Sequence, residues 1–321
     1  MALRWSPLES SASPLVTALR HGLQLKGNSL LMTLFGDAIA PRNQPVWLGT
    51  LIQLAGQLGL SSRLVRTSVY RLMADDWLVA SREGRRSYYR LSASGARRVE
   101  HARRRIYSPR AVAPETPHWT LLMVSSALRA SARQQLQREL LWNGYGEIAD
   151  GVYAHTEADP ASLQDILLAN QATHHVCVLQ AQGDRSMATR PLHALRNDCC
   201  CVQRLELAWQ RFTERFAPAQ AAASALCEHE AFLVRTLLVH EYRRILQRQP
   251  ILPHALESPE MVHRQAHQLF VKLYGQLHPR SERFLDQALT GAVVPAQADA
   301  TPAPARTALR RLSPTGALTL H

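Results

Sequence analysis

The segment SREGRRSYYRLS (residues 81–92) places three arginines around one glycine. The residues on either side alternate between apolar and polar types, which is typical of strands, so the segment predicts a β-hairpin with a charged tip. A guanidinium group on such a tip can form charge-assisted hydrogen bonds with a phosphate, although many charged turns are simply solvated. The tip residues assigned to phosphate or base contact are Arg82, Gly84, Arg85, Arg86 and Ser87.

The preceding segment, SSRLVRTSVYRLMADDW (residues 61–77), predicts a helix with Ser61 or Ser62 as its N-cap. The inward stripe is expected to be Leu64, Val65, Ser68, Val69 and Leu72. The opposite face has no acidic residue as far as Arg71, and its side chains suit phosphate oxygens and guanine edges. The outward residues assigned to nucleic acid are Ser62, Arg63, Arg66, Thr67, Tyr70 and Arg71.

Two earlier helices are needed to position this one. NSLLMTLFGDAI carries Leu30, Leu31, Leu34 and Phe35 on one face, and VWLGTLIQLAGQLGL predicts a second helix ended by Gly59. Three helices followed by a hairpin is the order of a winged helix-turn-helix. In that fold the third helix enters the major groove of DNA while the hairpin contacts the neighbouring backbone or minor groove. SGARRVEHARRRIY predicts a further helix after the hairpin.

The positive charge of the chain is concentrated in this region. The whole chain has 37 basic and 25 acidic residues, a formal net charge of +12. Residues 60–110 contain 13 arginines and 4 acids, so this segment alone carries 13 − 4 = +9. A field concentrated in this way attracts polyanions, whereas an evenly spread charge mainly favours solubility.

The remainder of the chain predicts an α+β multidomain protein. After a proline-rich stretch, strands and helices alternate as βαββαβ, the ferredoxin-like arrangement, and the last third is helical. The expected parts are a flexible arm (1–26), a winged helix-turn-helix domain (27–107), a linker (108–117), a ferredoxin-like domain (118–185), a helical C-terminal effector and dimerisation domain (190–288) and a disordered tail (289–321).

Several motifs together resemble one protein family. LFGD, VWLG, VRT, REGRRSYYRLS and VHEYRR are similar to motifs of the PaaX family, repressors of phenylacetate-degradation operons, and the likeness extends over about residues 25–290. WTLLMVSSALRASARQQLQRELLWNGYGEIADGVYAH resembles the Cas2-like central domain of that family. The segment ILQRQPILPHALESPEMVH keeps a Leu-Pro pair of the family but lacks its later tryptophan.

The resemblance implies a homodimeric repressor that binds an inverted repeat in double-stranded operator DNA. It also implies that phenylacetyl-CoA, or a related aryl acyl-CoA, releases the protein from DNA, and that the protein is not an enzyme and needs no cofactor. Arginines suit the phosphates of such an effector and aromatic rings suit its phenyl group, although aromatic residues at helical spacing are commonly core. The residues assigned to the effector are Trp209, Phe212, His240, Tyr242, Arg243 and Arg244.

Other functions find less support in the sequence. A Cas2-like nuclease, the alternative, needs a carboxylate near the end of the first strand of the ferredoxin-like domain, where Ser125 and Ser126 stand. His174, His175 and Cys177 could suggest a metal site together with three adjacent cysteines at 199–201, but there is no CxxC pair, so no metal is expected. No leader segment and no apolar run of about 18 residues is found, so the protein is expected to be cytoplasmic, without membrane contact.

Overall fold

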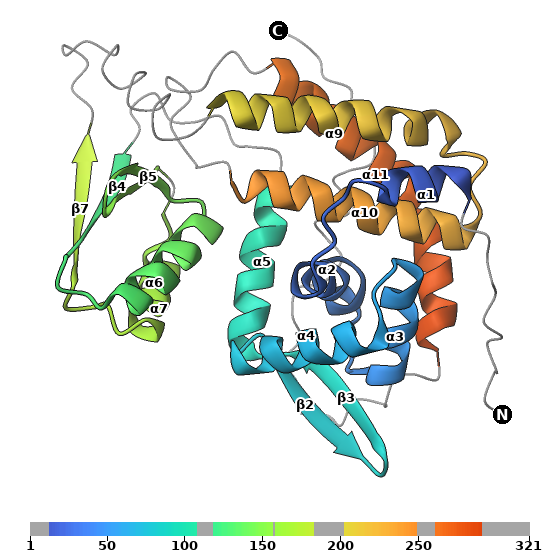
Figure 1. Cartoon of the computed structure of the whole chain (residues 1–321), viewed down its shortest axis with the longest axis horizontal. Coiled ribbons are helices and arrows are strands. Elements are labelled where there is room, and N and C mark those ends of the chain that lie inside the picture. The colour runs from blue at the N-terminus through green and yellow to red at the C-terminus, as the bar shows by residue number, and fades with distance from the viewer. Residues whose placement is uncertain (1–12, 108–117, 157, 183–201, 249–260, 291–321) are drawn as a thin grey trace, which may run out of the picture. The chain divides into compact units, whose positions relative to one another are not determined.

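The computed structural model describes residues 13–107, 118–156, 158–182, 202–248 and 261–290. The chain divides into two compact units (Figure 1). The first unit comprises Met1–Ser108, Phe212–Tyr242 and His267–His321, and the second comprises Pro109–Arg211 and Arg243–Ala266. The expected C-terminal helical domain is therefore shared between the two units instead of standing apart. The expected linker (108–117) and most of the expected tail (from 291) lie outside the described residues.

The first unit begins with helices that enclose an apolar core. α2 (Gly27–Thr33) continues directly into a π-helical turn (Leu34–Ile39). Leu30, Leu31, Leu34 and Phe35 are all buried, as the spacing predicts. A short strand and two further helices follow: β1 (Val46–Trp47), α3 (Leu48–Gln57) and α4 (Ser62–Ala74). The three expected helices before the hairpin are therefore present.

A three-stranded antiparallel sheet completes this part of the unit. β2 (Leu78–Glu83) pairs with β3 (Arg86–Leu91), and β3 pairs on its other side with β1, giving the order β1-β3-β2. Only Gly84 and Arg85 connect β2 to β3. Gly84 has φ +55°, and a positive φ at the first position of a two-residue loop is the requirement of a type II′ turn, which favours glycine. The hairpin projects away from the helices (Figure 1).

The N-terminal residues differ from the flexible arm that the sequence predicts. Residues Pro14–Arg20 form α1, and Val16 and Leu19 on this helix are buried. Burial of two large apolar side chains is enough to hold a short helix on a core that its own length would not stabilise. The expectation was therefore wrong for residues 14–20, while residues 1–12 lie outside the described part.

The C-terminal helices belong to both units by sequence range. These are α9 (Val202–Ala222), α10 (Glu228–Leu246) and α11 (Met261–Leu289), whereas the earlier helix α5 (Ala93–Tyr107) lies wholly in the first unit. α10 is buried on all sides from Ala231 to Arg243. A helix that is buried all round is the centre of a core, not the surface of a separate domain. Within the first unit, Phe232 on α10 stacks on Phe284 of α11, with ring centroids 5.0 Å apart. The first unit thus combines the N-terminal module (residues 27–107) with residues of the C-terminal helices.

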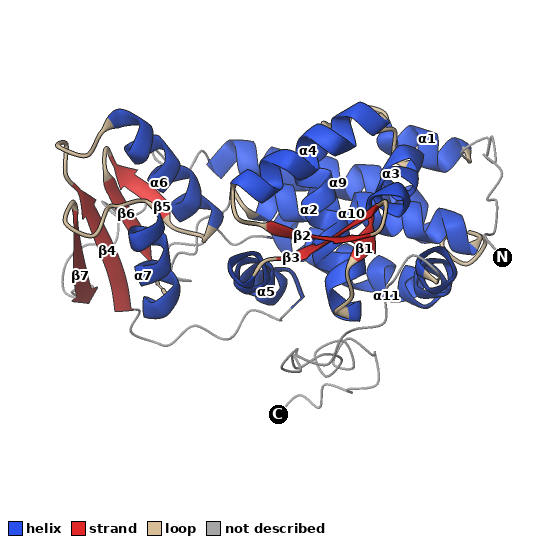
Figure 2. Cartoon of the chain, turned by 90° about the horizontal axis from the view of Figure 1, so that it is seen from below, coloured by secondary structure: helices blue, strands red, loops and turns tan. Residues whose placement is uncertain are grey.

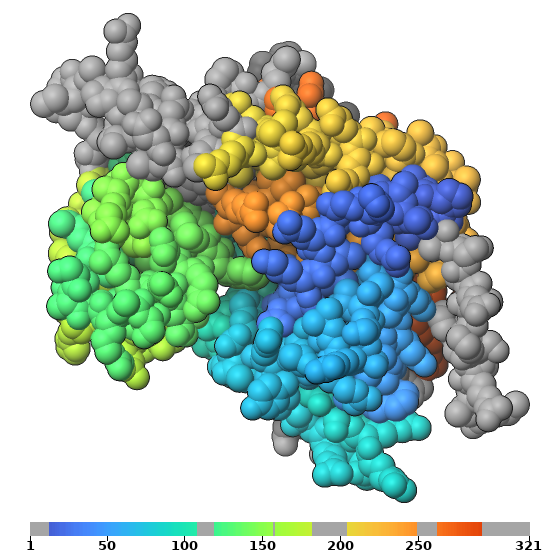
Figure 3. Space-filling view, in the orientation of Figure 1, coloured from blue at the N-terminus to red at the C-terminus, as the bar shows by residue number. Residues whose placement is uncertain are grey.

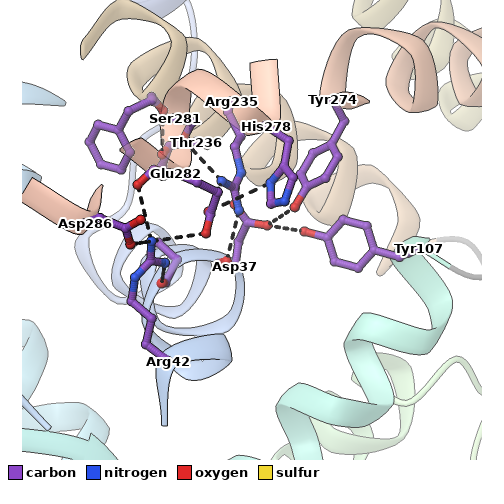
Figure 4. A network of polar contacts seen from close by, with 12 residues as sticks. Asp37, Arg42, Tyr107, Arg235, Thr236, Tyr274, His278, Ser281, Glu282 and Asp286 are labelled. Carbon is purple, nitrogen blue, oxygen red and sulfur yellow. Dashed lines mark hydrogen bonds and ion pairs between the residues drawn. The ribbon is translucent and has the colours of Figure 1, made fainter. Parts of the chain in front are cut away.

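A network of charged and hydroxyl groups lies inside the first unit (Figure 4). Arg235 of α10 forms an ion pair with Asp37 of the π-helical turn, with Nε 2.8 Å from Oδ2. Tyr107 and Tyr274 both donate hydrogen bonds to the other carboxylate oxygen of Asp37, Tyr274 over 2.9 Å. Arg235 also pairs with Glu282 over 2.6 Å. The network therefore joins the N-terminal helices to α5, α10 and α11.

The second unit contains a four-stranded sheet with helices on one face (Figure 2). Its strand order is β5-β6-β4-β7, and each neighbouring pair is antiparallel. The expected βαββαβ order of elements is present, and the α+β class of the whole chain is confirmed. The elements are β4 (His118–Val124), α6 (Ala130–Trp142), β5 (Gly146–Ala149), β6 (Val152–His155), α7 (Pro160–Ala169) and β7 (Val176–Gln182).

The helices of the second unit cover a compact apolar cluster. Leu136 and Leu140 of α6 and Leu163 of α7 pack against Leu122 and Tyr153 of the sheet. Asp159 is the N-cap of α7, and its carboxylate accepts hydrogen bonds from the backbone N–H groups at the start of the helix. None of the helices in the described ranges has both the length and the apolarity needed to cross a bilayer.

Candidate nucleic-acid interface

The start and the buried stripe of α4 determine which of its residues face outward. Ser61 is the N-cap, and its hydroxyl accepts a hydrogen bond from the backbone N–H of Leu64 over 3.2 Å. Val65, Ser68, Val69 and Leu72 are buried, which follows the predicted stripe. Leu64 also lies against Gly27 of α2, but the residue is 40% exposed, so it is less buried than the rest of the predicted stripe. It lies in the first turn of the helix at the edge of the stripe, about 100° from Val65.

The end of α4 sets the direction of the hairpin. The backbone N–H of Trp77 bonds to the carbonyl of Leu72 over 2.8 Å, and that of Asp76 bonds to the carbonyl of Met73 over 3.1 Å. This pair of bonds is a Schellman motif, with Asp76 in the left-handed conformation at φ +53°. Ser92 then donates to the carbonyl of Asp76, which ties the end of β3 to the same turn. These hydrogen bonds therefore fix the orientation of the hairpin relative to α4.

The outward face of α4 carries basic and hydroxyl side chains. Tyr70 is 74% exposed. The Thr67 hydroxyl donates to the carbonyl of Arg63 over 3.0 Å, so this side chain is fixed along the helix. Neither Arg63 nor Arg66 nor Arg71 forms an ion pair with any residue in the described ranges. The residues that the sequence assigned to this face, all of them exposed, are Ser62, Arg63, Arg66, Thr67, Tyr70 and Arg71.

The hairpin presents a second set of basic side chains. Arg82, Gly84, Arg85 and Arg86 are exposed, while Ser87 is half-buried. Arg82 and Arg86 lie within the strands, opposite Ser87 and Glu83 respectively, so only Gly84 and Arg85 form the turn itself. The guanidinium carbon of Arg86 lies 4.9 Å from the centre of the Trp47 ring. In the space-filling view the hairpin stands out beyond α4 (Figure 3).

These two surfaces can bind a polyanion. Guanidinium groups that have no internal partner keep their five N–H donors available for phosphate oxygens or for the edge of guanine. A helix of this diameter fits the major groove of B-form DNA, and a projecting hairpin can lie along the adjacent backbone. α4 contacts β2 within the same unit, so both surfaces can meet one duplex.

The residues that the sequence assigned to an effector are mostly buried and are divided between the two units. In the first unit, the ring of Phe212 meets that of Tyr242 edge-on at 5.6 Å, and the Tyr242 hydroxyl lies 2.8 Å from Nδ1 of His267. Nδ1 of His240 lies 3.2 Å from the Thr33 hydroxyl. Burial raises the pKa of Tyr242, so its hydroxyl stays protonated. These three side chains therefore have packing and hydrogen-bonding partners inside the unit.

The other assigned effector residues belong to the second unit. The Trp209 ring lies 4.8 Å from that of His263. The Arg243 guanidinium lies over the ring of Trp142 at 5.3 Å, and Arg243 is buried while Arg244 is partly exposed. Their part in effector binding stays a prediction.

The residues considered for a nuclease or a metal site form no catalytic or metal-binding group in the described ranges. At the end of β4, the Ser125 N–H bonds to the carbonyl of His175, and the Ser125 hydroxyl accepts from the N–H of Ala127. No group of three His, Cys, Asp or Glu side chains that could hold a metal ion occurs among the described residues. Cys177 has an exposed free thiol, and the cysteines at 199–201 lie outside the described part.

Sequence reasoning missed two features of the first unit. Trp47 lies against Arg86 of the hairpin, and the local sequence around Trp47 does not indicate this contact. The partnership of Asp37 and Arg235 joins positions 198 residues apart in the chain. The LFGD motif marked Asp37 as part of a family pattern but did not indicate its partner.

Comparison with known proteins defines the class to which this chain belongs. Residues 26–95 match the family model described as PaaX-like protein, and residues 202–287 match the model described as PaaX-like protein C-terminal domain. Transcriptional repressor PaaX of Escherichia coli (strain K12) is 31% identical over 285 residues, which are 86% of this chain and 89% of that protein. The chain therefore belongs to the PaaX family, as its motifs predict.

A solved structure is also similar. Uncharacterized protein Rv0674 from Mycobacterium tuberculosis is 22% identical, and the match has a TM-score of 0.42 and covers 78% of this chain and 96% of that one.

Proposed function

We propose that the protein is a DNA-binding transcriptional repressor of a phenylacetate (aromatic) catabolic operon. The observation that carries the proposal is the acid-free outward face of α4 beside an arginine-bearing hairpin. The name of the Escherichia coli relative, a transcriptional repressor, supports the same function. The charge of +9 between residues 60 and 110 supports binding to a polyanion.

In this proposal the N-terminal module is a winged helix-turn-helix. α4 lies in the major groove, where Arg63 and Arg66 donate to phosphates or guanine edges and the exposed Tyr70 can contact a thymine methyl group. Arg82, Arg85 and Arg86 lie beside the backbone of the same duplex. Each phosphate that they neutralise releases condensed counterions, so binding weakens as salt rises.

The protein acts as a homodimer on an inverted repeat. Two copies of α4 then enter successive major grooves about one helical turn, roughly 34 Å, apart. An aryl acyl-CoA, phenylacetyl-CoA or a relative of it, releases the dimer by favouring an arrangement with the wrong spacing. A shift of operator occupancy from 99% to 1% needs a preference of about 5.5 kcal/mol for the released form. A CoA thioester offers enough phosphate and apolar surface for a preference of that size.

The second unit is proposed to be ferredoxin-like, because its strand order and antiparallel pairing fit that arrangement. A nuclease of the same fold is not proposed. The serines at the end of β4 offer no carboxylate for the metal that such hydrolysis uses.

The test is a DNA selection followed by a binding titration. Purified protein is used to enrich duplexes from a random-sequence library, and the affinity for the enriched duplex is compared with that for a shuffled one by fluorescence anisotropy. A repressor is expected to bind the enriched sequence about 10³-fold or more tightly than the shuffled one. Equal affinity for both duplexes contradicts the proposal.

A second arm addresses the effector and the nuclease. Phenylacetyl-CoA, other aryl acyl-CoAs, free CoA and phenylacetate are each titrated into the complex, and only the aryl thioesters are expected to release DNA. Labelled duplex incubated with the protein and Mg²⁺ is expected to stay intact. Release by free CoA alone, or cleaved strands, contradicts this part of the proposal.

A further inference from the structure

Arg86 differs from the other arginines of the hairpin because an aromatic ring lies beside its guanidinium group. The 4.9 Å between the guanidinium carbon and the centre of the Trp47 ring is within the range of a cation–π contact. Arg82 and Arg85 have no ring contact, hydrogen bond or ion pair with any residue in the described ranges. Of the three guanidinium groups near the hairpin tip, that of Arg86 is thus held by the protein, and those of Arg82 and Arg85 are not.

Trp47 is itself fixed from several sides. It lies on β1, pairs with Tyr88 on β3 and is the residue that precedes the first turn of α3. Its ring lies directly over Gly49. A Cβ atom at Gly49 would lie 2.5 Å from the ring atoms Cζ3 and Cη2, so only glycine leaves room for the indole there. The ring therefore packs closely against the start of α3.

We propose that Trp47 is a positioning residue for phosphate recognition. Its ring holds the Arg86 guanidinium at one place beside the hairpin, ready to meet a backbone phosphate of duplex DNA. This inference rests on the proposed function. An arginine that is already held loses less rotamer freedom on binding than a fully mobile one, so the contact gains affinity without any contact between Trp47 and DNA.

The alternative role for Trp47 is purely structural, as one more half-buried ring of the module. The two roles differ in how they depend on Arg86. A structural role lowers binding by the same factor whether or not Arg86 is present, whereas a positioning role has no effect once the Arg86 side chain is removed. Comparing Trp47 variants in the two backgrounds therefore separates them.

The experiment uses the full chain and a fluorescent mixed-sequence duplex of about 30 base pairs, close to three helical turns. No operator is needed, because phosphate contacts are independent of sequence. Trp47, Trp47→Phe and Trp47→Leu are compared with Arg86 present and in the Arg86→Ala background. With Arg86 present, affinity is expected to fall in the order Trp, Phe, Leu by about two- to fivefold in total. In the Arg86→Ala background the three are expected to bind alike.

The salt dependence supplies a readout that a structural role would not move. Arg86→Ala is expected to reduce the slope of log affinity against log salt by about one, and Trp47→Leu is expected to reduce it by part of that amount. Trp47→Phe is expected to restore most of the slope. Equal losses of affinity in both backgrounds, or an unchanged slope in Trp47→Leu, would overturn the proposal.

A matched control is present in the same unit. Arg98 lies over the ring of Trp77 at the same distance, 4.9 Å, but on α5 and not on the hairpin. Trp77→Leu is expected to change binding by the same factor with and without Arg86. Circular dichroism monitors folding, and if Trp47→Leu does not fold, Trp47→Phe in the two backgrounds decides the question. A wild-type chain that does not bind the duplex refutes the proposed function. If the wild-type chain binds but the effects of the Trp47 and Arg86 substitutions simply add, only the role of Trp47 is refuted.

Discussion

Arg66 on α4 and Arg235 on α10 belong to the same unit, yet their guanidinium groups have opposite surroundings. Arg66 is exposed and has no ion-pair partner in the described ranges. The side chain of Arg235 is 2% exposed and faces Asp37, Glu282 and Ser281 within hydrogen-bonding distance. One residue type thus stands exposed and without an ion-pair partner on α4, where the proposed function uses it for recognition, and holds buried elements together on α10.

The two arginines differ in whether their charge interacts with groups inside the protein. Burial acts to lower the pKa of Arg235, but the carboxylates of Asp37 and Glu282 outweigh it and raise that pKa, so the guanidinium stays charged inside the unit. Burial raises the pKa of Tyr107, and the facing Asp37 adds to the shift, so its hydroxyl remains a donor. These groups face one another through ion pairs and hydrogen bonds. The arginines of α4 have no ion-pair partner in the described ranges, and in the proposed function their donors meet DNA.

The largest effect is expected from breaking the buried pair. Asp37→Ala leaves the Arg235 charge without its main partner, and removing one member of a buried pair costs about 3–5 kcal/mol. Urea unfolding of the full chain measures the change. Asp286→Ala is the matched control, because Asp286 lies at the exposed end of the same network with a side chain 69% exposed, where a pair contributes about 0–1 kcal/mol. Similar losses in both variants would show that burial is not the cause.

The next effect concerns binding rather than stability. Arg66→Ala is expected to weaken binding to the enriched duplex by about 1–3 kcal/mol if Arg66 contacts a base edge. Its free energy of unfolding is expected to change by less than about 0.5 kcal/mol, since the side chain is exposed. Arg138→Ala, on the exposed face of α6 in the second unit, is the control and should leave DNA affinity unchanged. Loss of stability without loss of affinity would reverse the contrast between Arg66 and Arg235.

The exposed surface could be predicted from the sequence because local rules produce it. The N-cap at Ser61, the 3.6-residue spacing of Val65 and Leu72, and the glycine at the hairpin turn all act over a few residues. Leu64 is more exposed than predicted because spacing does not say how far a stripe extends at the first turn of a helix.

The buried network could not be predicted in the same way. Asp37 and Arg235 are 198 positions apart, and nothing in either local pattern indicates the other. The burial of α1 likewise depends on what Val16 and Leu19 meet in the folded unit, not on their own short segment. The same applies to Trp47, whose ring stands beside Arg86 only because β1 pairs with β3.

A smaller effect is expected at the turn of the hairpin. Arg85 lies in the two-residue loop itself, with no partner in the described ranges, so it suits a phosphate and not a base edge. Arg85→Ala should weaken binding to the enriched and shuffled duplexes by the same factor, and should reduce the salt slope of log affinity by about one. Anisotropy titrations at several salt concentrations measure both. A loss confined to the enriched duplex would mean that Arg85 contacts bases.

The smallest effect is expected where charges pair on the surface. Glu100 and Arg104 form an ion pair at i and i+4 on α5, with 3.5 Å between the carboxylate and Nε, and their side chains are 58% and 75% exposed. Water and salt screen such a pair, so Glu100→Ala should change the free energy of unfolding by no more than about 0.5 kcal/mol. Removing this carboxylate from the basic segment should slightly strengthen binding to any duplex, because Arg104 no longer has a competing anion. A stability loss near that of Asp37→Ala would contradict the distinction, since an exposed pair would then hold the fold as firmly as a buried one.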